Sequence, residues 1–296
     1  MPASYPFTPE LGWSITRYDR FVSCKRQYFF EYYSRFETEV PPQRLAFLKS
    51  LTSVPLEVGN LVHDTIAVLL HRLRKSTAPI NTDKVLAYSY NLADRALAHK
   101  PWHETYYGRV EQIDGDDLKA KVMVCLQNFF GSRWYDWILQ DAVARRDAWI
   151  IEPDDYGEIR VKGLKAYCKV DFLFPTEDGT VYILDWKTGG SNAKKHTRQM
   201  KGYVLYAKEI RNADILRVRP IVVYLNGRYV ELENIFSESD LDEFAEQIAV
   251  ETQEMHEYCV SVEENIPKPK DDFPPQTSAL CAYCHYREIC DKQTVA

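Results

Sequence analysis

The spacing of apolar residues predicts helices over the first half of the chain. Aromatic side chains recur with helical spacing over residues 14–33, with a break near Cys24, and aliphatic side chains continue the period from 59 to 73. The segment 82–147 has the same spacing, with a loop expected around 101–115. The residues that define the first two stripes are Tyr18, Phe21, Tyr28, Tyr32, Ile66, Leu69, Leu70 and Leu73.

The period then changes from helix to strand. Residues 149–152, 158–174 and 181–187 have the composition of strands, and Glu177-Asp178-Gly179 is a natural turn between the last two. A helix is predicted over 194–210, where Met200, Val204 and Ala207 supply the core stripe.

A hairpin and a third helix are predicted next. Strands over 220–225 and 228–232 flank Asn226-Gly227, a pair typical of a two-residue turn. Ser239 is the expected cap of the helix that follows, which would bury Leu241, Phe244, Ile248 and Met255.

This order of elements predicts an α/β fold. Its core would be a mixed β-sheet flanked by helices, with a helical insertion over about 64–147. No internal repeat or low-complexity tract interrupts the chain, so we expect a single domain over 1–296.

Composition restricts the class of protein. Hydrophobic residues are 45% and charged residues 27% of the 296, values typical of globular chains rather than disordered ones. No stretch approaches the roughly 20 apolar residues of a membrane span. The N-terminus, with Pro2, Pro6 and Pro9, lacks the apolar core of a signal peptide. A cytoplasmic protein with no membrane partner is expected.

Charge is distributed unevenly although the net charge is only −6. From Asp185 to Arg219 there are nine Lys and Arg against three Asp and Glu, whereas Glu231 to Asp272 has fourteen acids and two lysines. The basic band would follow a phosphate backbone, and solubility alone is the competing explanation. The acidic tract has the pattern of a solvated helix face.

The seven cysteines cannot all pair within the chain. Cys125, Cys168 and Cys259 stand alone in apolar surroundings and are expected to be small buried residues. Clustering predicts a metal centre for the other four, which are Cys24, Cys281, Cys284 and Cys290. Thiolates bind both zinc and iron–sulfur clusters, and His285 offers zinc an alternative ligand.

Asp185 and Lys187 are candidate catalytic residues. Side chains alternate across a strand, so both project to one face, while Trp186 projects to the other. Asp171, on the preceding strand of an expected hairpin, would place a second carboxylate nearby. Paired carboxylates favour a divalent cation, and a cation beside a lysine is suited to phosphodiester hydrolysis. An Asp-x-Lys pair taken alone occurs often by chance.

Four motifs together resemble the PD-(D/E)XK nuclease superfamily, specifically its RecB-like branch. In the order of that branch they are Gly59-Asn60-Leu61-Val62-His63, Asp171, Asp185-Trp186-Lys187-Thr188-Gly189 and Gln199-Met200-Lys201-Gly202-Tyr203. The resemblance implies a restriction-endonuclease-like sheet core. Upstream, Glu152 matches an acidic position of the family loosely, and a solvent-facing strand residue is the alternative.

The resemblance also implies roles for individual residues. His63, Asp171, Asp185 and the backbone carbonyl of Trp186 would bind Mg²⁺ or Mn²⁺, with Lys187, Asp185 and Asp171 as the catalytic set. Gln199 and Tyr203 lie four residues apart on one helix face, where the family places residues that hold the substrate strand.

The cysteine spacing resembles that of AddB-type nuclease domains and CRISPR-associated adaptation exonucleases. In those families a 4Fe–4S cluster ties the chain ends together, which here implies a structural staple between Cys24 and a C-terminal segment of about 273–296. Tyr28, Phe29, Tyr32 and Tyr33 around the first ligand either stack on bases or pack around the cluster.

The resulting hypothesis is a metal-dependent DNA exonuclease acting on single strands or DNA ends, in recombination, repair or CRISPR adaptation. No Gly-x4-Gly-Lys-Ser/Thr segment is present, so a helicase would be a separate partner, as would CRISPR adaptation proteins. The alternatives are a non-catalytic iron–sulfur DNA-binding or scaffold protein and a site-specific endonuclease. The sequence determines neither the oligomeric state nor the polarity of degradation.

Overall fold

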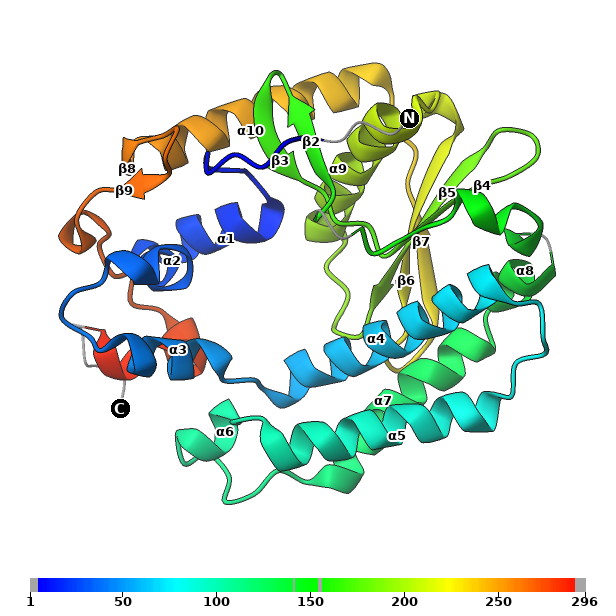
Figure 1. Cartoon of the computed structure of the whole chain (residues 1–296), viewed down its shortest axis with the longest axis horizontal. Helices are drawn as coiled ribbons and strands as arrows, with labels where there is room; N and C mark the ends of the chain where they lie inside the picture. The colour runs from blue at the N-terminus through cyan, green and yellow to red at the C-terminus, as the bar shows by residue number, and fades with distance from the viewer. Residues whose placement is uncertain (1–4, 141, 154–155, 291–296) are drawn as a thin grey trace. The chain divides into compact units, whose positions relative to one another are not determined.

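The computed structural model describes residues 5–140, 142–153 and 156–290, which separate into two compact units. Unit 1 consists of residues 53–159 and 168–242, and unit 2 of residues 5–52, 160–167 and 243–290 (Figure 1). The expectation of a single nuclease domain over 1–296 stays a prediction. None of the helices in the described residues is long and apolar enough to cross a membrane.

Unit 1 is built on a mixed five-stranded sheet with the order β1-β4-β5-β6-β7. The central pair, β5 and β6, is parallel and is connected by helix α9, while the other pairs are antiparallel. The element bounds are β1 Ile150–Ile151, β4 Phe172–Pro175, β5 Val181–Lys187, α9 Ala193–Arg211, β6 Val218–Tyr224 and β7 Val230–Glu233. The mixed α/β class predicted from the periodicity is confirmed.

Helices cover one face of this sheet and share its core. Apolar residues of α4, α5, α7 and α8 form one buried cluster with Leu184 and Trp186 of β5 and with Phe172 of β4. The Trp186 ring meets Phe129 of α7 edge-on, with centroids 5.2 Å apart. The helical bounds are α4 Val54–Lys75, α5 Thr82–His99, α6 His103–Tyr106, α7 Gly115–Phe130, α8 Arg133–Gln140 and η2 Ala142–Ala148.

The strand pattern expected over 158–174 is interrupted. β2 (Glu158–Val161) and β3 (Leu164–Tyr167) form a separate two-stranded sheet, and only β4 joins the five-stranded one. A turn with Lys162 at φ 51° and Gly163 at φ 80° reverses the chain between β2 and β3. Asp171 therefore lies one residue before β4 rather than within a long strand.

The connection between β6 and β7 is longer than the two-residue turn expected at Asn226-Gly227. Pairing ends at Tyr224 and Val230, because Leu225 N–H donates to Lys187 O instead. Asn128 of α7 holds the loop by donating to the carbonyl oxygens of Leu225 and Gly227.

Helix α10 (Glu238–His256) begins earlier than expected. Ser237, not Ser239, precedes it, and Ser237 Oγ accepts from Asp240 N–H while Asp240 Oδ2 accepts from Ser237 N–H. Reciprocal bonds of this kind satisfy two amide donors at a helix start.

Unit 2 packs the segments near both ends of the chain around an aromatic core. Tyr28, Phe29 and Tyr33 are at most 1% exposed, so packing, rather than base stacking, is their role. Arg26 Nε donates to Phe273 O at 2.9 Å, which joins the two segments. The bounds of its elements are α1 Ile15–Ser23, α2 Lys25–Tyr33, η1 Ser34–Phe36, α3 Pro42–Ser50, β8 Cys259–Ser261, β9 Ile266–Pro267, η4 Lys270–Asp272, η5 Ala279–Tyr283 and η6 Arg287–Ile289.

The interleaved core of unit 1 predicts a large cost for truncating Leu184. This side chain is 0% exposed between the sheet and its helices, so Leu184→Ala should lower the free energy of unfolding by about 2–5 kcal/mol. Leu216→Ala is the matched control, because Leu216 is 61% exposed. Urea unfolding followed by tryptophan fluorescence measures both, and equal losses would contradict the description of the core.

Candidate active site

Unit 1 brings the predicted acids, lysine and histidine together around the end of β5. The alternation expected for that strand is observed, since Trp186 enters the helical core while Asp185 contacts α9. The predicted residues gathered here are His63 of α4, Asp171 before β4, Asp185, Trp186 and Lys187 of β5, and Gln199 and Tyr203 of α9.

Asp171 and His63 are joined to each other and to the backbone of β5. Asp171 Oδ2 accepts from Trp186 N–H at 2.9 Å, and Asp171 Oδ1 lies 3.5 Å from His63 Nδ1. His63 Nε2 donates to Trp186 O at 2.9 Å. Trp186 of β5 is thus held through its own N–H by Asp171 and through its own carbonyl group by His63 of α4.

Helix α9 supports the second carboxylate. Asp185 is 0% exposed, and its Oδ1 accepts from Tyr203 O–H at 3.0 Å. Gln199 Nε2 in turn donates to the Tyr203 hydroxyl at 2.6 Å. Gln199 and Tyr203 are therefore positioned to orient Asp185, and Lys187 Nζ lies 2.6 Å from its other oxygen.

The buried charges shift one another's pKa. Burial alone would lower the pKa of His63, but the adjacent Asp171 outweighs it and raises that pKa to about 9. The pKa of Asp171 is lowered, because His63 and Lys187 outweigh its burial. Burial, together with the charge of Asp171, raises the pKa of Asp185 in spite of Lys187. An imidazolium and an ammonium compensate the two acids.

The donor set fits a divalent cation in its chemistry. Two carboxylates and a backbone carbonyl supply the oxygen ligands that Mg²⁺ and Mn²⁺ prefer, and the imidazole of His63 would add a nitrogen ligand. The buried Asp185 Oδ2 lies 2.6 Å from the Lys187 ammonium. In the described residues, however, no three His, Cys, Asp or Glu side chains are already arranged to hold a metal ion. The donor atoms bond to one another, and cation binding would require His63 to lose its proton.

A pocket of about 460 Å³ opens beside these residues. Two of the predicted ligands line it, together with residues from α4 and from the loops around the sheet. The lining residues are Pro55, Leu56, Gly59, Asn60, His63, Asp64, Glu152, Lys169, Asp171 and Thr188. At Gly59 a Cβ would lie 3.3 Å from Thr188 Oγ1, so a larger residue would crowd this wall.

Several lining residues, Asn60, Thr188 and Lys169 among them, were not singled out from the sequence. Asn60 lies inside the Gly59–His63 motif and Thr188 follows the candidate lysine, so both had a positional signal. Lys169 lies two residues before Asp171, a spacing that would indicate the same face only in a regular strand.

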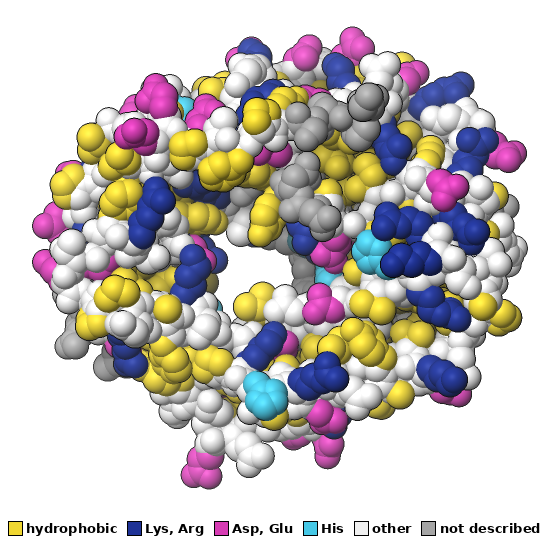
Figure 2. Space-filling view, in the orientation of Figure 1, with side chains coloured by type: hydrophobic (Ala, Val, Ile, Leu, Met, Phe, Trp, Pro, Cys, Tyr) yellow, Lys and Arg dark blue, Asp and Glu magenta, His cyan; other side chains and the backbone are white. Residues whose placement is uncertain are grey.

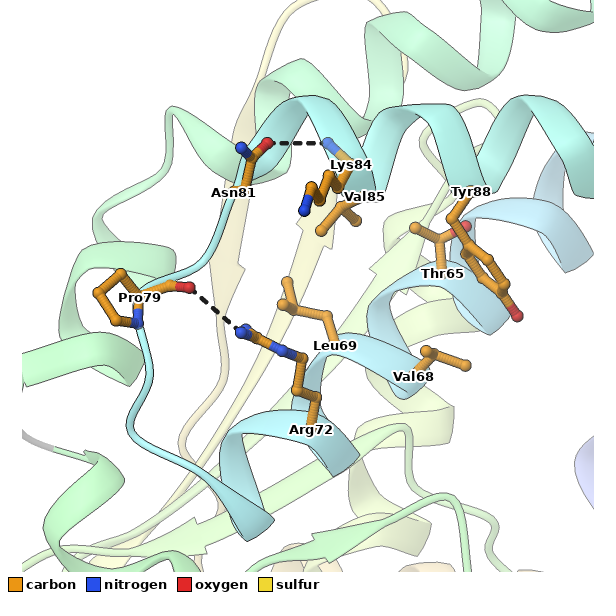
Figure 3. A pocket seen from close by; sticks show the side chains of 9 residues that line it. All are labelled: Thr65, Val68, Leu69, Arg72, Pro79, Asn81, Lys84, Val85 and Tyr88. Atoms are coloured by element: carbon orange, nitrogen blue, oxygen red, sulfur yellow. Dashed lines mark hydrogen bonds between the residues drawn. The ribbon is translucent and has the colours of Figure 1, made fainter.

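A second pocket of about 300 Å³ lies between α4 and the start of α5 (Figure 3). Leu69, Val68 and Val85 supply apolar walls, and Arg72 donates to Pro79 O at 3.1 Å. No His, Asp, Glu or Cys lines it among the described residues, so it lacks ligands for a catalytic cation.

The four clustered cysteines lie in unit 2. Gln276 links the two ends of the chain there, because its N–H donates to Cys24 Sγ at 3.5 Å while Cys281 Sγ donates to its carbonyl at 3.8 Å. Burial raises the pKa of Cys284 to about 11, with added repulsion from Cys24, Cys290 and Cys281. The four thiols are thus neighbours. No metal-holding arrangement is found here either, within the described residues.

The three remaining cysteines differ from this cluster. Cys125 is 0% and Cys168 5% exposed, and burial raises the pKa of the Cys168 thiol to about 12. Both are buried, as expected from the sequence. Cys259 is partly exposed and contacts the Tyr33 hydroxyl.

Comparison with known proteins identifies the family. A sequence model described as the PD-(D/E)XK nuclease superfamily matches residues 12–291. The chain belongs to the PD-(D/E)XK nuclease superfamily. Membership indicates a metal-dependent nuclease, and nucleases of this superfamily generally use Mg²⁺ or Mn²⁺. The mixed sheet and its helices are consistent with a restriction-endonuclease-like fold.

Other comparisons add little. No significant match is found among curated proteins. One solved structure, described as "Crystal structure of SSO0001", is 14% identical and covers 91% of this chain and 96% of its own, with a TM-score of 0.33.

The basic band predicted from the sequence lies in unit 1. Figure 2 shows Lys and Arg side chains gathered on the surface of this unit. Lys194 and Lys208 of α9 are exposed, and Lys201 lies 3.6 Å from Asp240. Exposed cations of this kind are available to a nucleic-acid partner, which a nuclease requires.

The Tyr203 hydroxyl should stabilise the folded protein, because it donates a hydrogen bond to the buried carboxylate of Asp185. Tyr203→Phe leaves Asp185 Oδ1 without this donor, so the free energy of unfolding should fall by about 1.5–3 kcal/mol. Urea unfolding measures the loss.

Tyr182→Phe provides the control for that measurement, because the Tyr182 hydroxyl makes no hydrogen bond within the described residues. A loss for Tyr203→Phe no larger than that of the control would show that the bond to Asp185 contributes nothing.

Proposed function

We propose that this chain is a DNA exonuclease that hydrolyses phosphodiester bonds of single strands or DNA ends. The observation that carries the proposal is the meeting of Asp171, Asp185, His63 and Lys187 around Trp186 at the end of β5. Superfamily membership supports the nuclease chemistry. The exonuclease assignment rests on His63 preceding the acids, a feature of exonucleases in the RecB-like branch.

In this proposal His63 Nε2, the carboxylates of Asp171 and Asp185, and Trp186 O hold one or more divalent cations. When bound, the cation would polarise the scissile phosphate and lower the pKa of a water molecule. Bond breaking would require both acids to be ionised, and a bound cation would favour the ionised form of Asp185 against the pKa increase caused by its burial. Asp171 is stabilised by the Trp186 N–H group, and Asp185 by Tyr203.

Lys187 has a separate role. Its ammonium, held at Asp185 on a side chain that is 21% exposed, stays protonated because the two acids raise its pKa. It would orient the attacking water or neutralise charge that develops on the phosphate. Gln199 and Tyr203 position Asp185, and the strand would approach along the exposed cations of α9.

We also propose that Cys24, Cys281, Cys284 and Cys290 hold a structural 4Fe–4S cluster. Three observations support it: the thiols are neighbours, Gln276 connects Cys24 to Cys281, and Ser278 N–H donates to Cys281 Sγ at 3.4 Å. Amide donors to sulfur are usual around such clusters. In recombination, repair or CRISPR adaptation, a helicase or adaptation proteins would be separate partners.

Removing Asp185 should abolish cleavage. Asp185→Ala deletes one carboxylate from a set that acts together, so degradation of end-labelled single-stranded DNA with Mg²⁺ or Mn²⁺ should fall roughly a thousandfold or more. Chelation should stop the wild-type protein, and Asp242→Ala, at an exposed acid, should not change the rate.

The same assay separates the rival functions. Release of nucleotides from linear but not circular single strands supports the exonuclease, and the label position gives the polarity. Cleavage of circles would indicate an endonuclease. Absence of cleavage by folded, cluster-loaded protein would instead favour a DNA-binding or scaffold protein.

The cluster can be tested independently. Cys284→Ala should lose iron, acid-labile sulfide and visible absorption, and should unfold at lower temperature, because unit 2 would lose one of the connections between the segments near the two chain ends. Cys259→Ala, outside the cluster, should retain all of these. Zinc in place of iron in anaerobically purified wild-type protein would contradict the iron–sulfur assignment.

A further inference from the structure

One basic side chain lines the pocket beside His63 and Asp171. Lys169 is the single Lys or Arg among the lining residues in the described part of the chain. Its ammonium lies 2.7 Å from Glu152 Oε2, and its side chain is 44% exposed. A half-exposed lysine on a flexible stem can exchange one anionic partner for another at little cost.

Glu152 is held at the pocket by an unusual backbone. Its φ is 38°, in the left-handed region that side chains other than glycine rarely adopt. Its N–H donates to Asp171 O at 3.1 Å, which continues the pairing of β1 with β4 by one residue. Strained backbone that the surrounding structure retains is concentrated at functional sites.

The charges around this pair explain why a lysine is needed there. Asp64, Glu152 and Asp171 line the same pocket. A phosphate entering a pocket with three acids is repelled by them. The imidazolium of His63 is already paired with Asp171, and Lys169 is the further positive group among the described lining residues that can offset that repulsion.

We propose that Lys169 binds a backbone phosphate of the DNA strand next to the scissile bond, and that Glu152 holds the ammonium in place until the strand arrives. This subsite rests on the proposed nuclease function, which it deepens. Thr188 and Asn60 line the same pocket and offer neutral donors to the strand. Lys169 is thus a substrate-binding residue, and Glu152 is its resident counter-ion.

Binding of a labelled single-stranded oligothymidylate, measured by fluorescence anisotropy in the Asp185→Ala background, tests the subsite without cleavage. Lys169→Gln should raise Kd about five- to tenfold and reduce the slope of log K against log salt by about 0.7, the value for one phosphate contact. Lys169→Arg should retain the wild-type Kd, because it keeps the charge.

Lys162→Gln is the matched control, because Lys162 is also 44% exposed and paired with a glutamate, Glu246, but belongs to unit 2. Glu152→Gln should tighten binding about two- to threefold, since it releases the ammonium. Circular dichroism confirms that each variant is folded.

The proposal is overturned if Lys169→Gln binds as tightly as Lys162→Gln, or if Glu152→Gln weakens binding as much as Lys169→Gln does. If the wild-type protein cleaves DNA but Lys169→Gln leaves Kd unchanged, the proposed subsite is wrong and the proposed nuclease function stands. If Lys169→Gln weakens binding as predicted but the wild-type protein never cleaves DNA, the proposed subsite stands and the proposed nuclease function is wrong.

Discussion

Strand β5 must bury apolar side chains and a carboxylate at adjacent positions, and the geometry of the site depends on how it accommodates both. Leu184 and Trp186 are buried among helices, where any polar atom would need a partner. Asp185, between them, is equally buried but points to the other face, where Tyr203 donates to it. Strand alternation allows an apolar core and a buried carboxylate to lie one residue apart.

The neighbours of β5 follow from that buried charge. An unpartnered carboxylate in the interior is costly, so α9 supplies Tyr203 and Gln199, and β5 itself supplies Lys187. Asp171 adds a second charge, which His63 balances from α4. Elements far apart in sequence are thereby brought together around Trp186, and a cation binding there would have to displace contacts that these donor atoms now make with one another.

Unit 2 has a different organisation. Its aromatic core packs the segments near the two chain ends against each other, with Arg26 bonded to the Phe273 carbonyl. The four thiols belong to these segments, and the aromatic contacts also hold the segments together. The cysteines belong to unit 2 and the β5 site to unit 1, so the proposed cluster and the proposed catalytic cation are tested by different measurements.

The sequence by itself determined the alternating faces of β5, the helical faces of α4 and α9, and the grouping of the cysteines, because these are local periodicities and spacings. Its errors were also local: it assigned the α10 cap to Ser239 rather than Ser237, and it expected a two-residue turn where Leu225 pairs with β5 instead. Only the tertiary structure decided that His63 bonds to Trp186 O and that Lys169 pairs with Glu152 beside Asp171. Those contacts depend on how distant segments pack, and spacing along the chain carries no information about packing.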